Sequence, residues 1–248
     1  MFARAGNFKD LVTDAGLPID LSWKGARRDE LVRLAMDYQP NVVVTEAFPF
    51  GRRQLSFELL PLLEAMTAMA PRPVVVASVR DILQEDRKQE RISETLETLN
   101  RFFDRVLVHG DPAFARLEET FPMADEIACP IHYSGLVSGP PPSAGGRPAR
   151  TQGEVLVSAG GGATRGERLL SAALDARPLT SIRDLTWRLL LGPNLPVVEA
   201  ERLRQRSEKV VVIENNRSDF SELLAGCALS VSQAGYNTVC DILRASCR

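Results

Sequence analysis

The ten residues from Ser232 to Asp241 could bind a phosphate and a sugar. An apolar segment of strand length, residues 227–231, precedes them, and apolar residues at helical spacing follow. Gly235 is therefore predicted to lie in a tight turn between a strand and a helix. Such a turn directs bare N–H groups and the positive end of the helix dipole at one point. Asp241, about one turn into the helix, could accept hydrogen bonds from a sugar diol. An ordinary helix-start turn is the competing interpretation.

A second bend, Gly160-Gly161-Gly162, follows a predicted buried strand and precedes a predicted helix. Glycines in this position let a backbone approach a diphosphate closely and turn its N–H groups toward it. A P-loop is excluded because the sequence has no Lys-Ser/Thr pair after the glycines.

Three interpretations of this bend stay open. A dinucleotide site could use Gly160, Gly162 and Gly166, but it would also need an acid at the end of the next strand. That strand ends in Gly192-Pro193-Asn194. A nucleotide-sugar site could be assembled from this bend and the turn at Gly235, and a purely structural glycine turn is the third possibility.

Strands and helices alternate along the chain, and the strands are apolar throughout, which favours parallel sheets covered on both faces. The predicted strands are residues 41–45, 73–78, 105–108, 131–135, 154–158, 187–191, 210–213 and 227–231. The predicted helices are residues 23–38, 56–69, 86–103, 112–120, 165–176, 197–206 and 220–225, with a last one after Gly235. A Pro/Gly-rich linker, 138–153, separates a first domain, 1–137, from a second, 154–248. Ligands of such sheets bind at the carboxyl ends of the strands, in the cleft expected between the two domains.

Composition excludes several classes of function. The 248 residues are 44% hydrophobic and 25% charged, as expected for a soluble globular protein. A net charge of −2 gives no broad nucleic-acid surface. We find no apolar run of transmembrane length and no secretory signal, so a cytoplasmic location is expected. The four cysteines form no CxxC pair and there are only two histidines, so no metal site is expected.

The stretches 158–163 and 232–241 together resemble the donor-binding half of glycosyltransferase family 28, which includes the bacterial N-acetylglucosaminyltransferase that makes lipid II. More closely, the chain is similar to the "predicted glycosyltransferase" branch of these GT-B enzymes. The stretches that carry this similarity are 45–53, 57–62, 78–83 and 106–112. The resemblance extends over nearly the whole chain, and its motifs are specific in combination.

The resemblance implies an α/β GT-B fold with two Rossmann-like parallel-sheet domains that face each other across a cleft. In the family the C-terminal domain binds a UDP-sugar, which here would be the donor substrate; no separate cofactor is implied. Carried over, Gly161 and Gly162 contact the diphosphate, and Asp241, where the family usually has Glu, contacts the ribose. The residues expected nearby are Ser232, Gln233, Gly235, Asn237 and Thr238.

The implied reaction moves a hexose or N-acetylhexosamine to an acceptor hydroxyl by direct displacement. The absence of a DxD motif fits a metal-independent site. The acceptor would be a small molecule or a lipid-linked one, the latter placing the protein at the inner membrane face. A base should come from the ends of the predicted strands in the first domain. The candidates there are Glu46, Asp81, His109 and Asp111, with Glu46 and Asp81 as the leading pair. Each could instead satisfy loop amides.

An anionic acceptor could pair with Arg52, Arg53 or Arg80, although arginines on a solvated loop are commoner. The chain departs from the family at both ends: it has no N-terminal strand with a Gly/His-rich loop, and it stops before the second sheet is complete. We therefore expect a truncated protein with both domains incomplete. A nucleotide-sugar 2-epimerase and a non-catalytic nucleotide-sugar-binding protein are the rival functions.

Overall fold

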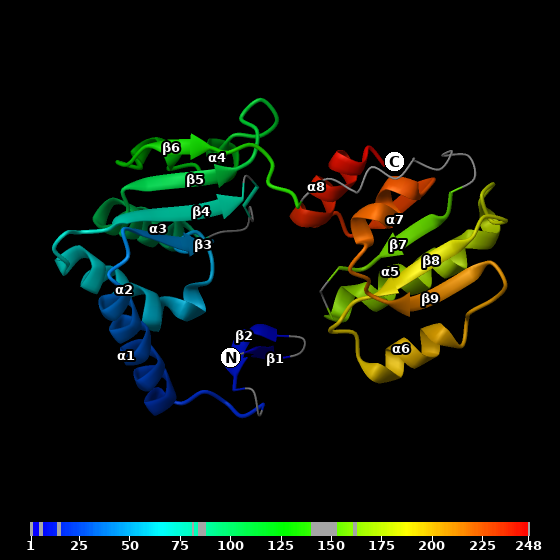
Figure 1. The fold of residues 1–248 in the computed structure, drawn as a ribbon, viewed down its shortest axis with the longest axis horizontal. Helices are drawn as coiled ribbons and strands as arrows, with labels where there is room; N and C mark the ends of the chain where they lie inside the picture. Colours follow the sequence, from blue (N-terminus) through cyan, green and yellow to red (C-terminus); the bar gives the residue numbers. More distant parts are fainter. Residues whose placement is uncertain are drawn as a thin grey trace. The chain divides into compact units, whose positions relative to one another are not determined.

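A computed structural model describes residues 2–4, 7–13, 16–80, 82–83, 88–139, 153–160 and 163–247 of the chain. By its internal contacts the chain divides into two compact units, residues 1–137 and 138–248. Each unit contains a four-stranded parallel sheet with helices against it, and Figure 1 shows both. Most of the predicted linker, 138–153, lies outside the described residues.

The sheet of unit 1 has the order β3-β4-β5-β6, with every neighbouring pair parallel. Its strands are β3 (Val42–Glu46), β4 (Val74–Arg80), β5 (Arg105–His109) and β6 (Ile131–Tyr133). Its helices are α1 (Leu21–Tyr38), α2 (Ser56–Ala68), α3 (Gln89–Phe102) and α4 (Leu117–Thr120), with short 3-10 turns η1 (Arg53–Leu55) and η2 (Ala124–Glu126). Consecutive strands are spatial neighbours, so their carboxyl ends form one edge in chain order.

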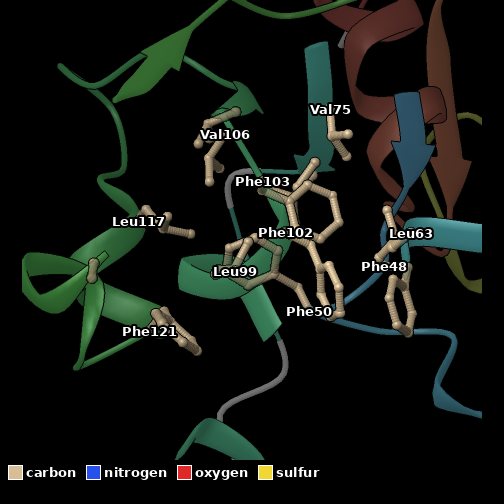
Figure 2. Close-up of a cluster of buried hydrophobic side chains, with 14 of the residues drawn as sticks. Phe48, Phe50, Leu63, Val75, Leu99, Phe102, Phe103, Val106, Leu117 and Phe121 are labelled. Atoms are coloured by element: carbon tan, nitrogen blue, oxygen red, sulfur yellow. The ribbon is translucent and has the colours of Figure 1, made fainter. Parts of the chain in front are cut away.

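The core of unit 1 lies between one face of this sheet and helices α2 and α3. Figure 2 shows aromatic rings and aliphatic side chains from these elements, including Leu63, Leu99 and Val75, meeting in one cluster. Phe50 and Phe121 contact each other edge to face at 5.2 Å between ring centroids. Burying these large side chains supplies the main favourable free energy for folding of the unit.

The other face of this sheet differs from the expectation of helices on both sides. Val42, Val44 and Val74 point away from the core, and 53%, 59% and 41% of their surfaces are exposed. The period-2 alternation of a strand sends these residues opposite to Val43 and Val75. Helices α2 and α3 both pack against the face that carries Val75. On the opposite face, the described residues leave the β3 end of the sheet without a covering helix.

Two further expectations for unit 1 need correction. The first residues, for which the sequence predicted neither a strand nor a helix, form an antiparallel hairpin, β1 (Phe2–Arg4) and β2 (Asn7–Val12). The predicted helix over 112–120 shrinks to α4, because Asp111 closes a turn in front of it. The Asp111 carboxylate accepts a hydrogen bond from the Ala113 amide at 2.8 Å. Asp side chains commonly divert a backbone from helix to turn in this way.

The sheet of unit 2 has the order β10-β7-β8-β9, again all parallel. Its strands are β7 (Val155–Ser158), β8 (Trp187–Leu191), β9 (Val211–Asn215) and β10 (Leu229–Ser232). Its helices are α5 (Ala163–Ala176), α6 (Val197–Arg204), α7 (Phe220–Gly226) and α8 (Tyr236–Ala245), with a 3-10 turn η4 (Arg177–Leu179). Here both faces are covered as predicted: α5 and α6 contribute to one core, and α7 and α8 to the other. Among the described residues, no helix combines the length and apolar character needed to cross a membrane.

Leu63→Ala tests the core of unit 1. Leu63 is fully buried, so the truncation should lower the free energy of unfolding by about 2–5 kcal/mol through lost burial and a residual cavity. Urea denaturation followed by circular dichroism measures this change. The matched control is Leu21→Ala, at a side chain that is 85% exposed, which should change stability by less than about 0.5 kcal/mol. Equal effects of the two substitutions would contradict this core assignment.

Candidate functional site

The two predicted bends of unit 2 begin at neighbouring points of one sheet edge. β7 and β10 pair in parallel, and Ser158 is in register with Ser232. The Gly160 bend follows Ser158, and the Gly235 turn follows Ser232. Because parallel strands end at the same edge, both bends leave the carboxyl side of the sheet next to each other. The two segments that the sequence proposed to combine therefore start from adjacent strand ends.

The first bend is built on close backbone approaches. Gly160 has φ +62°, a left-handed conformation that glycine adopts without steric cost. Gly192, directly after β8, lies so near that a Cβ on it would be 2.3 Å from the Gly160 carbonyl oxygen. A Cβ on Gly166 in α5 would be 3.0 Å from the Ala159 Cβ. These glycines therefore have a packing role, while Gly161 and Gly162 lie outside the described residues.

The second bend places Gly235 at the N-cap of α8, with φ −64° and ψ 149°. The left-handed residue of the turn is Ala234, with φ +51°, so the unusual backbone conformation is one residue earlier than the glycine suggests. The Ala234 amide donates to the Ser232 hydroxyl at 3.2 Å. No side chain caps the helix, and the first helical bond runs from the Val239 amide to Gly235.

The predicted side chains of this bend border that helix start. Gln233 and Asn237 are exposed, and Ser232 and Thr238 are half-buried. The first amides of any α-helix lack acceptors within the helix. An exposed turn at the start of α8 therefore suits an anion, with polar side chains on both sides of it.

Asp241 is half-buried on α8, about 8 Å along the axis from Tyr236. Burial raises the pKa of its carboxyl group, and nearby Arg244 offsets this in part. A carboxylate that has lost part of its hydration gains from hydroxyl donors, and a ribose diol supplies two.

A separate cleft of about 300 Å³ lies near the amino end of β7 and includes Glu154, Arg188 and Glu222 in its lining. The Arg188 guanidinium donates to Glu154 at 2.5 and 2.8 Å and to Glu214 at 2.5 Å. These two carboxylates raise the pKa of Arg188 and neutralise its charge. The cleft is therefore a poor anion site, and it lies at the opposite strand ends from the two bends.

In unit 1 the carboxyl edge of the sheet positions Glu46. Glu46 ends β3 in register with Ser78 of β4. The following residue, Ala47, has φ +64°, and its amide donates to the Ser78 carbonyl at 2.7 Å. The Thr45 hydroxyl donates to the Phe48 carbonyl at 2.7 Å. Backbone and side chain on both sides of Glu46 thus fix the exposed carboxylate at the end of its strand.

Glu46 belongs to a row of four hydrogen-bonded side chains. The Ser78 hydroxyl lies 3.0 Å from Glu46 Oε2 and 2.8 Å from His109 Nε2. His109 Nδ1 lies 2.8 Å from the hydroxyl of Ser134, just past β6. The sequence predicted Glu46 and His109 as separate candidates. Ser78 and Ser134 were missed, although both lie at or beside predicted strand ends, the one signal that could have found them.

The other candidates of unit 1 have different surroundings. Asp111 has a structural role in the turn before α4. Arg53 forms an ion pair with Glu94 of α3, and Arg80 ends β4 with an exposed side chain. Asp81 lies outside the described residues. Within the described ranges, no group of three or more His, Cys, Asp or Glu side chains is placed to hold a metal ion.

No protein-family model matches the sequence, and no curated protein matches it. Solved structures do match in three dimensions. The pneumococcal O-GlcNAc transferase GtfA in complex with UDP and GlcNAc is 12% identical, with a TM-score of 0.53, over 96% of this chain and 50% of that one. A Listeria monocytogenes protein assigned as a UDP-N-acetylglucosamine 2-epimerase is 12% identical, with a TM-score of 0.53, over 91% and 61%.

A plant enzyme matches as well: Phytolacca americana UGT2, solved with UDP-2-fluoro-glucose and pterostilbene, is 12% identical with a TM-score of 0.50, over 88% of this chain and 59% of that one. This chain thus spans between half and about three fifths of the length of these three proteins. At such identities the likeness concerns the fold. The chain has the GT-B α/β fold, which nucleotide-sugar glycosyltransferases share with UDP-N-acetylglucosamine 2-epimerases.

Proposed function

We propose that this protein is a glycosyltransferase that moves a hexose or N-acetylhexosamine from a UDP-sugar to an acceptor hydroxyl. Within the GT-B fold, we assign it to family 28 on the two bend motifs. The observation that carries the proposal is the pairing of Ser158 with Ser232, which starts both bends from adjacent points of one sheet edge. A diphosphate needs several backbone donors converging from more than one segment, and this register supplies two segments.

Each predicted donor contact is given a role in this proposal. The amides of the Gly160–Gly162 bend and of the α8 start would bind the two phosphates, with the helix dipole offsetting their charge. The half-buried carboxylate of Asp241 would accept from the ribose hydroxyls. This charge stabilisation would also favour departure of UDP without a metal ion.

The reaction would be a direct displacement. The acceptor oxygen attacks the anomeric carbon, the bond from that carbon to the UDP oxygen breaks, and UDP leaves with the bonding electrons. The acceptor's proton would pass to Glu46, an exposed carboxylate fixed at the end of β3. Asp81 stays the second candidate base, on sequence alone. A small-molecule or lipid-linked acceptor carrying negative charge would pair with Arg52, Arg53 or Arg80.

An epimerase is the second candidate, because a protein assigned as a UDP-N-acetylglucosamine 2-epimerase shares this fold. The two reactions differ in their need for an acceptor. Formation of a C2 epimer from UDP-N-acetylglucosamine in the absence of any acceptor would favour the epimerase.

Gly161→Val tests the first bend. A branched side chain would block the backbone approach to the diphosphate, so UDP affinity measured by calorimetry should fall about tenfold or more, a loss of at least about 1.4 kcal/mol. Gly139→Val is the matched control, because a Cβ on Gly139 meets nothing within 4 Å. Unchanged UDP affinity in Gly161→Val would remove this bend from the phosphate site.

Asp241→Ala tests the ribose contact. Loss of hydrogen bonds to a charged group costs about 1.5–3 kcal/mol, so UDP should bind about 10- to 150-fold more weakly. A UDP analogue without the 2′ and 3′ hydroxyls should bind wild type and variant with similar affinity. Equal losses for both ligands would place Asp241 outside the ribose site.

Glu46→Gln tests the base. Transfer of labelled sugar from UDP-glucose or UDP-N-acetylglucosamine into cell extract should fall by about 10²–10⁴-fold, the usual value of a general base. UDP affinity should stay the same, because the proposed donor contacts lie in unit 2. A variant that retains full transfer would eliminate Glu46 as the base, and loss of UDP binding in parallel would indicate a folding defect instead.

A further inference from the structure

Four polar side chains, one from each strand or its following residue, line the carboxyl edge of the unit 1 sheet. Glu46 and Ser134 at the two ends of the row are exposed, His109 is half-buried, and only 5% of the Ser78 surface is exposed. Three contacts of 2.8 to 3.0 Å connect them in the order Glu46–Ser78–His109–Ser134. We call these residues the edge row.

The sheet register produces the edge row. Ser78 is in register with Glu46 on β3 and with Leu107 on β5, while His109 is paired with Arg80. Residues two apart on a strand share a face, so His109 lies on the same face as Leu107 and its ring can reach Ser78. This face is opposite the one that carries Val75 and Val106 into the core.

The donors and acceptors of the edge row determine which atoms carry most of its hydrogen-bonding protons. An ionised Glu46 only accepts hydrogen bonds, so the single proton of the Ser78 hydroxyl must point to Oε2. The Ser78 oxygen then faces His109 Nε2 as an acceptor, which requires a proton on Nε2. In the neutral imidazole Nδ1 consequently carries no proton and accepts from the Ser134 hydroxyl.

All three donors therefore point toward the carboxylate: Ser134 to His109, His109 to Ser78, and Ser78 to Glu46. Hydrogen bonds aligned in one direction polarise and strengthen each other. The row also tolerates a charged imidazole, because the Ser134 hydroxyl can turn to the Gly135 carbonyl at 3.1 Å and accept from Nδ1–H.

The edge row contains an acid, a serine and a histidine, but its geometry differs from that of a hydrolytic triad. In a triad the carboxylate bonds to the histidine and the serine oxygen is exposed to substrate. Here the carboxylate bonds to the serine, the second ring nitrogen faces another serine, and Ser78 is buried. The arrangement instead directs hydrogen bonds at the exposed acid.

We propose that Ser78 and His109 are positioning residues that hold Glu46 as an oriented carboxylate, with neutral His109 kept in its Nε2–H form. This inference rests on the proposed function, in which Glu46 takes the acceptor's proton. The Ser78 hydroxyl donates to Oε2 of Glu46, and Oε1 of the same carboxylate receives the proton of the acceptor. The carboxylate thus keeps one orientation before and after the proton arrives, which preserves the geometry that proton transfer needs.

The test that needs no activity is nitrogen-15 NMR of the imidazole side chains. The chain has two histidines, and His132→Gln leaves His109 alone. At a pH where the ring is neutral, the spectrum should show His109 protonated at Nε2. In Ser78→Ala and in Glu46→Gln, the His109 ring should instead be a mixture of the Nδ1–H and Nε2–H tautomers. The control is Ser93→Ala, whose hydroxyl donates within α3, to the Gln89 carbonyl at 3.3 Å. A wild-type ring protonated at Nδ1, or an unchanged spectrum in Ser78→Ala, would overturn the proposal.

The activity test separates this inference from the proposed function. Ser78→Ala should lower kcat for transfer about tenfold with an unchanged KM for the donor, because only the orientation of the base is lost. His109→Phe should match it, and His109→Gln should recover part of the rate, since a glutamine amide can donate to Ser78. An unchanged kcat in Ser78→Ala would contradict the positioning role of Ser78, even if His109 is found in the Nε2–H form. If wild type neither binds UDP nor transfers sugar, the proposed function fails, and the tautomer result alone then decides whether the edge row orients Glu46.

Discussion

The parallel register of neighbouring strands is the constraint on which both candidate sites depend. In a parallel sheet every strand ends at the same edge, and register decides which residues meet there. The pairing of Ser158 with Ser232 starts two bends side by side in unit 2. The pairing of Glu46 with Ser78 starts the edge row in unit 1. In unit 1, a shift of one residue along β3 would turn Glu46 to the opposite face of the sheet, which packs against the core.

The glycines of unit 2 show how packing and binding can use the same residues. Gly192 is needed because the Gly160 carbonyl oxygen approaches it too closely for a side chain, and a Cβ on Gly166 would crowd the Ala159 Cβ at 3.0 Å. Gly160 is held in a left-handed conformation beside Gly192. This packing fixes the backbone at Gly160, the residue from which the bend starts, and a backbone point that is fixed in advance lowers the entropic cost of binding a ligand beside it. The structural and ligand-binding interpretations of the bend are therefore compatible.

Unit 1 offers a different chemistry from the same sheet architecture. Its strand ends carry an exposed acid, Glu46, whose carboxylate accepts from the Ser78 hydroxyl, and this hydroxyl in turn contacts the His109 ring. The two units thus divide the tasks of the proposed reaction: amide groups for a negatively charged leaving group, and an oriented carboxylate for a proton. The GT-B fold accommodates this division because each sheet has its own carboxyl edge.

The sequence by itself determined the strands of both four-stranded sheets and most of the helices, because periodicity and Gly or Pro punctuation are local properties of the chain. It also placed Glu46, His109 and both bends at the carboxyl ends of their strands. It missed the β1–β2 hairpin and overestimated the length of α4. Only the tertiary structure decided that β10 lies beside β7, that Ala234 takes the left-handed conformation, and that Ser78 and Ser134 join His109. The physical reason is that strand order and register follow from packing between residues far apart in the sequence, and single-sequence patterns do not contain that information.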